Sequence, residues 1–226
     1  MPPQPRLRRV LREAASDFYF HSWQFLGANL VLGALGLGFL IGSLASPWGL
    51  PLVVLLVLPT AGIMRMATRL NRDFHTDLGD FAEVVRRPWP ILGVGLVQLA
   101  ITVVLLVDIL IAAAWRSWPG TLLLVGALYA LLLLWVYALV AWPLLLDPER
   151  DADGVRSRLR LALVVLLAYP VRFGLFALLM GALLMLATVA IAPIITFAVG
   201  LVWLAIARYV LPVADRIEGR ETLVVD

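Results

Sequence analysis

Very few side chains in this sequence have the types and spacing that chemistry needs. Asp73, His75 and Asp77 alternate along the chain like a metal-ligand set. On a helix, however, His75 would point away from the two aspartates, so we expect no metal site there. The chain has no cysteine, which excludes disulfides, thiolate catalysis and cysteine-bound metals. It also has no serine–histidine pair, HExxH sequence, Walker A loop or dinucleotide fingerprint. The sequence therefore predicts a protein that is not an enzyme and holds no cofactor.

One acid, Asp108, lies well inside a strongly apolar segment. Ionisable groups within membrane spans are functional candidates by default. Asp108 could be a proton or cation site, could contact a polar substrate, or could reach the outer interface or a polar partner in the bundle. Gln98, Asn29 and Tyr137 are further polar side chains in apolar segments. They could line a cavity or make hydrogen bonds between helices, and their spacing leaves both roles open.

The composition places these residues in a membrane protein. Hydrophobic residues make up 62% of the 226 positions and charged residues only 15%. A soluble globular chain is nearer about 45–50% apolar and about 25% charged. All eighteen basic residues are arginines, and the net charge is +3. Their distribution between the apolar segments argues against a nucleic-acid partner and points to a lipid bilayer.

Six apolar segments are long enough to be considered as helical spans, since a bilayer core needs about 20 apolar residues. We predict an all-α bundle in which residues 1–24 precede a transmembrane domain at 25–211 and a tail at 212–226. Glycines in the first span, and Gly93 with Gly95 in the third, favour close helix packing. The predicted spans are 25–44, 50–64, 89–115, 121–146, 173–192 and 194–211.

The arginines give this bundle an orientation. With six spans and the N-terminus in the cytoplasm, seventeen arginines lie on the cytoplasmic side and only Arg116 lies outside. Counting residues 159–168 as a seventh span would change the ratio to thirteen against five. We therefore favour six spans with both termini in the cytoplasm, and we expect residues 159–170 to lie near the cytoplasmic face or against the bundle.

The inner connections contain amphipathic helical patterns. The N-terminal segment has an apolar face with arginines beside it, which predicts a helix in the plane of the membrane surface. A second helix is predicted within residues 71–87, where apolar residues recur at spacings of three or four. Its charged residues form a candidate docking surface for a protein partner, composed of Asp80, Glu83, Arg86 and Arg87.

Some of these features resemble the YesL-like family of bacterial membrane proteins. The resemblance rests on Asn29 near the start of the first span, on the Pro59–Gly62 stretch in the second, and on the inner segment from Asp80-Phe81 to Arg86-Arg87. The resemblance implies a small protein of the bacterial cytoplasmic membrane, of a kind often associated with carbohydrate uptake. It implies no catalytic residues.

Two functions follow as alternatives. The first is a non-enzymatic accessory or assembly subunit, which would bind a protein partner or a second copy through its charged inner helices. The second is a small-molecule carrier or a substrate-binding subunit of a transporter. A carrier predicts a polar cavity lined by Asp108, Gln98 and Tyr137, whereas an accessory subunit predicts a filled interior.

Overall fold

The computed structural model describes residues 7–45, 54–73, 75–86, 88–115, 117–190 and 197–220. These ranges are helical and contain no strand, which confirms the all-α prediction for the part of the chain they cover. The elements are α1 (Leu7–Phe20), α2 (Ser22–Ala45), α3 (Val57–Asp73), α4 (Leu78–Arg86), α5 (Trp89–Ala114), α6 (Trp118–Leu145), the 3₁₀ turn η2 (Pro148–Arg150), α7 (Val155–Ala168), α8 (Pro170–Ala190) and α9 (Val199–Glu218).

Within the described ranges, four helices are long and apolar enough to cross a membrane. They are α2 over Ser22–Leu44, α5 over Trp89–Ala114, α6 over Trp118–Leu145 and α8 over Pro170–Ala187. Helix is the natural form for such segments, because it satisfies every backbone N–H and C=O group internally. Four of the six spans predicted from the sequence coincide with these helices.

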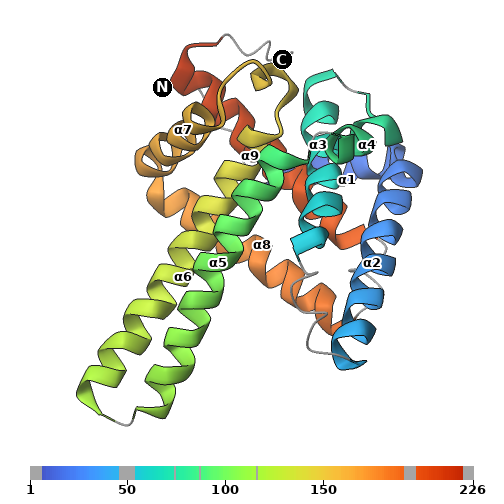
Figure 1. The fold of residues 1–226 in the computed structure, drawn as a ribbon. Helices are drawn as coiled ribbons and strands as arrows, with labels where there is room; N and C mark the ends of the chain where they lie inside the picture. Colours follow the sequence, from blue (N-terminus) through green and yellow to red (C-terminus); the bar gives the residue numbers. More distant parts are fainter. Residues whose placement is uncertain are drawn as a thin grey trace.

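The other two predicted spans fall on α3 and α9, which form the centre of the bundle. Both helices combine an apolar half with a charged half. They pack against each other, and every residue of α3 from Ala61 to Thr68 is buried. In Figure 1, α3 lies between the α5–α6 pair and α2, and α9 runs diagonally behind it toward α7. Arg65 and Asp215 of these helices are buried, whereas Asp73 and Arg216 near their ends are exposed.

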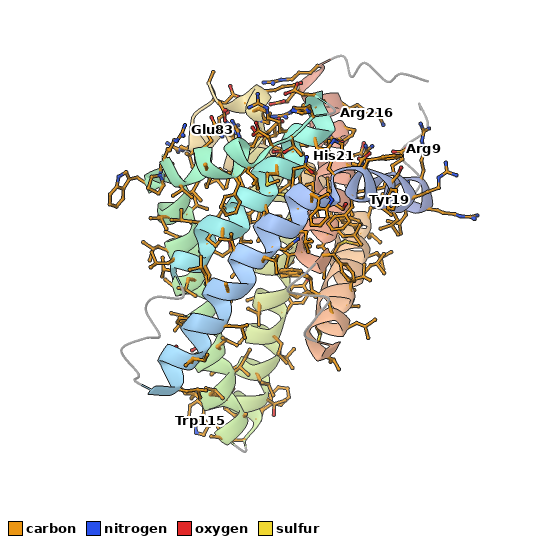
Figure 2. The ribbon with its side chains drawn as sticks, turned by 90° about the vertical axis from the view of Figure 1, so that its right-hand side faces the viewer. Arg9, Tyr19, His21, Glu83, Trp115 and Arg216 are labelled. Carbon is orange, nitrogen blue, oxygen red and sulfur yellow. The ribbon has the colours of Figure 1, made fainter. Side chains whose placement is uncertain are left out.

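Helices α5 and α6 form a long hairpin that extends away from the rest of the bundle (Figure 1). Most apolar side chains on the outer half of α5 are exposed, as expected for a surface whose solvent is lipid. The tip of the hairpin lies at the end of the molecule opposite Glu83 and Arg216, as the position of Trp115 shows in Figure 2.

The N-terminal helix α1 lies across the bundle, roughly crosswise to α2 (Figure 2). Its apolar face was expected to meet lipid. In the structure Val10 and Ala14 are buried, and α1 packs on α9. Arg208 of α9 reinforces this contact with a salt bridge of 3.1 Å to Glu13 and a second to Asp17. Part of the apolar face of α1 therefore contacts protein.

Helix α7 bears on the seven-span alternative. It has 14 residues, ends before Tyr169 and packs mainly on α6. A helix of that length covers about 21 Å, which is less than the core of a bilayer. Helix α7 is thus a separate, short element beside the bundle, and it lends no support to a seventh span.

Candidate functional site

A buried ion-pair network joins three elements at the charged end of the bundle. Arg72 of α3 donates hydrogen bonds to Asp215 of α9 at 2.7 and 3.0 Å, and to Asp147 at 2.6 and 3.1 Å. Arg150 of η2 donates to Asp215 at 2.7 Å and also contacts Asp147 and Glu218. The Arg150 and Asp147 side chains have no exposed surface. This bidentate, mutually paired geometry holds the ends of α3, α6 and α9 together.

The same network contains three carboxylates that lie close enough to hold a metal ion. One oxygen each of Asp147, Glu149 and Asp215 falls within 4.8 Å of the others. Guanidinium groups already occupy this site, since Arg72 forms salt bridges to all three acids. The arrangement fits a structural tie between helices better than a metal centre.

Asp215 gives this tie a pH dependence. Burial alone would raise the pKa of its carboxyl, but hydrogen bonds and charge from Arg72 and Arg150 outweigh burial and lower the pKa below its ordinary 3.8. A lowered folded-state pKa stabilises the fold at pH values above the ordinary pKa, and this contribution is lost as the pH falls through the folded value.

We therefore expect Asp215→Asn to be most destabilising at neutral pH. The gap in melting temperature between the wild type and this variant should narrow as the pH falls below about 3.8. Thermal unfolding followed by circular dichroism in detergent at pH 7, 5, 4 and 3 measures the gap. A gap that stays constant over this range would show that the Asp215 charge does not contribute to stability.

A second cluster of charges surrounds Arg65, which lies seven residues before Arg72 on α3. Arg65 donates to the Leu146 carbonyl at 3.0 Å, to Asp151 at 2.9 Å and to Glu83 at 3.2 Å. Thr68 donates to the same carbonyl at 2.8 Å. These bonds connect α3 to α4 and to the end of α6.

The Arg65 cluster forms one wall of a cavity of about 230 Å³, here called the mouth. Four charged side chains line the mouth, namely Arg65, Glu83, Asp151 and Arg158. Its remaining lining is apolar and comes from α4, α5, α6 and α7, as Val84, Pro90, Ile91, Val94, Trp142, Leu145, Leu146 and Val155.

A second cavity of about 320 Å³, here called the chamber, lies between α3, α5 and α6. Its lining is almost entirely apolar and includes Met64, Leu99, Leu139 and Trp203. Gly95 of α5 also belongs to the lining, and a Cβ placed on it would lie 2.7 Å from Val57 Cγ1. The absence of a side chain at Gly95 therefore permits the close approach of α5 to α3 beside the chamber.

The mouth and the chamber follow one another along the same three helices. On α5 the lining runs from Ile91 and Val94 at the mouth to Gln98 and Thr102 in the chamber, and α3 and α6 show the same progression. Trp142 lines both cavities, and its indole N–H donates to Gln98 Oε1 at 2.8 Å. The site is thus amphipathic, charged at one end and apolar at the other.

Trp203, which lines the chamber, has a polar group that is unpaired among the described residues. The Nε1 atom of Trp203 is buried and has no hydrogen-bond partner in the described part of the chain. Buried donors are nearly always paired, so this atom is an exception, but it has almost no accessible surface and does not present a donor to an occupant of the chamber.

The four polar residues singled out in the sequence are scattered. Gln98 lines the chamber. Asp108 is two to three turns further along α5, lines neither cavity, and has no ion-pair or hydrogen-bond partner among the described residues. Tyr137 donates to the Leu159 carbonyl at 3.1 Å and so joins α6 to α7. Asn29 is fully buried and donates to the Phe25 carbonyl at 2.9 Å, while its Oδ1 lacks a partner in the described chain.

The residues of the candidate docking surface have different environments. Asp80 is buried, accepts hydrogen bonds from Thr76 and from the backbone N–H of Asp77, and pairs with Arg69. Glu83 lines the mouth, and Arg86 is exposed. Arg87 lies outside the described residues. Of the three described positions, Asp80 is thus buried, and Glu83 and Arg86 are exposed.

Sequence patterns did not indicate the mouth or the buried ion network. Apart from Glu83 of α4, their carboxylates come from the short segment after α6 and from the end of α9, whose acids resemble solvated loop and tail residues. A usable signal was the insertion of Arg65 into an otherwise apolar run, because a buried guanidinium must find acidic partners. Nothing local indicated which acids these would be.

Comparison of the chain with protein-family models, with curated proteins and with solved structures found no match in any of the three. The resemblance to the YesL-like family therefore remains a prediction, and the geometry of the site is the basis for assigning a function.

Proposed function

We propose that this chain is an integral membrane protein that binds a small amphipathic molecule between α3, α5 and α6. The observation that supports it best is the continuous lining from a charged mouth to an apolar chamber, with Trp142 shared by both. Ligand sites are commonly concave and mostly apolar, with a few placed polar groups, and have volumes of about 300–1,000 Å³. Of the two functions predicted from the sequence, this is the carrier or substrate-binding alternative. The proposed site is lined by Arg65, Glu83 and Gln98. Asp108 and Tyr137, which the sequence had suggested, are not part of it.

The proposal includes the six-span topology in a bacterial cytoplasmic membrane, with α3 and α9 as the two central spans and both termini on the cytoplasmic side. Its support is the position of the charged groups. Glu83, Arg216, His21 and Arg9 gather toward one end of the molecule, and Trp115 lies at the other (Figure 2). The mouth would then open on the cytoplasmic side of the bilayer.

The test is to fill the chamber. Ala138 is buried and lines it, so the ring in Ala138→Phe would occupy the space of a ligand. We expect the amount of co-purified amphiphile, measured by mass spectrometry of protein in nanodiscs, to fall by about tenfold, which corresponds to about 1.4 kcal/mol of binding free energy. Leu99→Trp fills the chamber from α5 and should give the same result.

Ala113→Phe is the matched control, because Ala113 is exposed on α5 and lines neither cavity. It should leave the bound amphiphile unchanged. If both chamber-filling variants fold, elute as the wild type does and still bind the same amount, the proposed site is wrong.

An accessory subunit is the second candidate. One observation favours it: Leu78 and Val85 are large apolar residues exposed on α4, beside the exposed Arg86. A partner bound there, for example in a carbohydrate-uptake system, should be lost from the purified complex on Arg86→Glu and retained in Ala138→Phe.

A further inference from the structure

The charged side chains of the mouth differ in what they offer to a ligand. The guanidinium groups are enclosed, with 6% of the Arg65 side chain and 12% of the Arg158 side chain exposed. The carboxylates are open, with 49% of the Glu83 side chain and 50% of the Asp151 side chain exposed. A molecule entering the mouth therefore meets acids, although the protein as a whole is basic.

The donors of the two arginines are largely committed to the protein. In Arg65, Nε and both Nη atoms donate to Glu83, Asp151 or the Leu146 carbonyl. Arg158 donates to the carbonyls of Leu145 and Asp153. An anionic head group would have to displace these bonds and approach two carboxylates, which is unfavourable on both counts.

The acceptors, in contrast, have free capacity. The hydrogen bonds from Arg65 to Glu83 both reach Oε2, at 3.2 and 3.4 Å. A carboxylate can accept about four hydrogen bonds, so Glu83 and Asp151 can each take further donors. Below them Trp142 supplies an aromatic wall between the mouth and the chamber. Indole is the side chain that attracts cations best through its ring.

We propose that the molecule bound at this site carries a positively charged ammonium head group. The head lies at the mouth against the exposed sides of the Glu83 and Asp151 carboxylates, which Arg65 does not cover, and beside Trp142. The apolar chain extends into the chamber along Leu99 and Leu139. This rests on the proposed function and specifies its ligand class. An aminophospholipid head group and a free long-chain amine share this chemistry.

The experiment uses three photoreactive probes with the same alkyl chain, bearing a diazirine near the chain end and an amine, an alcohol or a carboxylate as the head. The full chain in phosphatidylglycerol nanodiscs is labelled with each probe, and the modified peptides are identified by mass spectrometry. We expect chamber-lining peptides to be labelled by the amine about fivefold more than by the alcohol, and least by the carboxylate.

Glu83→Gln should reduce this preference for the amine to nearly equal labelling. Arg65 keeps Asp151 and the Leu146 carbonyl as partners in that variant, so the fold should persist. Asp73→Asn is the matched control, since Asp73 is an exposed acid on α3 that pairs with Arg69 and lines neither cavity. It should retain the full preference.

The outcomes separate the two proposals. Equal labelling of the chamber by all three probes, or a preference unchanged in Glu83→Gln, would overturn the ammonium assignment and leave the binding site standing. Failure of every probe to label the chamber would overturn the proposed function itself. Adding phosphatidylethanolamine to the nanodiscs identifies the source: competition with the amine probe supports a lipid head group, and undiminished labelling supports a free amine.

Discussion

Asp215→Ala is expected to lower the free energy of unfolding by about 3–5 kcal/mol, because it removes one of the two carboxylates that two buried guanidinium groups share. Arg150 has no exposed surface and the Arg72 side chain is 11% exposed, so water cannot replace the lost carboxylate. Reversible unfolding in mixed micelles with increasing mole fraction of sodium dodecyl sulfate, followed by circular dichroism, measures the change.

The control is Asp153→Ala. Asp153 pairs with Arg220 at 3.4 Å, and more than a third of each side chain is exposed. Exposed pairs contribute about 0–1 kcal/mol, so this variant should unfold almost like the wild type. If the two variants were equally stable, the network at Arg72 and Arg150 would not be what holds α3, η2 and α9 together.

Gly200→Leu is the second substitution with a large expected effect. A Cβ on Gly200 of α9 would lie 2.9 Å from Asn29 Nδ2, 2.9 Å from Phe25 Cδ1 and 3.3 Å from Phe18 Cε2. Phe25 and Asn29 are fully buried, so they have little room to move. We expect this overpacking to lower the free energy of unfolding by about 1–3 kcal/mol and to displace α1 and α2 from α9.

Gly38→Leu tests whether this effect belongs to the contact rather than to glycine in general. Gly38 of α2 is exposed, and a Cβ added to it would have no atom of the described chain within 4 Å. It should unfold at the same detergent fraction as the wild type, and proteolysis should release α1 in Gly200→Leu alone. Equal behaviour of the two variants would contradict the packing role of Gly200.

These two glycines also show where prediction from sequence reached its limit. Glycines in the first apolar segment predicted close helix packing, yet Gly36, Gly38 and Gly42 face open space in the described chain. The close approaches to another helix involve Gly62, Gly200 and Gly95, and of these only Gly95 was predicted. A glycine permits a close contact, but whether a neighbouring helix fills that space depends on the tertiary arrangement.

The helices themselves were predictable because their signal is local. Apolar length identifies α2, α5, α6 and α8 without any knowledge of their neighbours. For α3 and α9 the same measure is ambiguous, because Arg65, Arg72 and Asp215 interrupt the apolar pattern. The burial of these charges depends on partners from distant parts of the chain, which hydropathy does not encode.

The candidate site was predicted only in part for the same reason. Gln98 was identified because it is polar in an apolar segment, and it does line the chamber. Asp108 was selected by the same rule. It lies six positions beyond Thr102, which lines the chamber, and it lines neither cavity itself. Glu83 was assigned to a docking surface, because nothing in its own helix indicates that Arg65 and Asp151 approach it.

The ion network also has a consequence for how the protein is made. Arg72 and Asp215 are 143 positions apart, so a ribosome must add all the residues between them before this pair can form. Until then α3 carries an arginine with an incomplete set of counter-charges. A truncated chain that lacks the end of α9 keeps this defect permanently. The arrival of α9 is therefore the step that completes the counter-charges of Arg72 and Arg150, so the folding of α3 depends on a helix synthesised long after it.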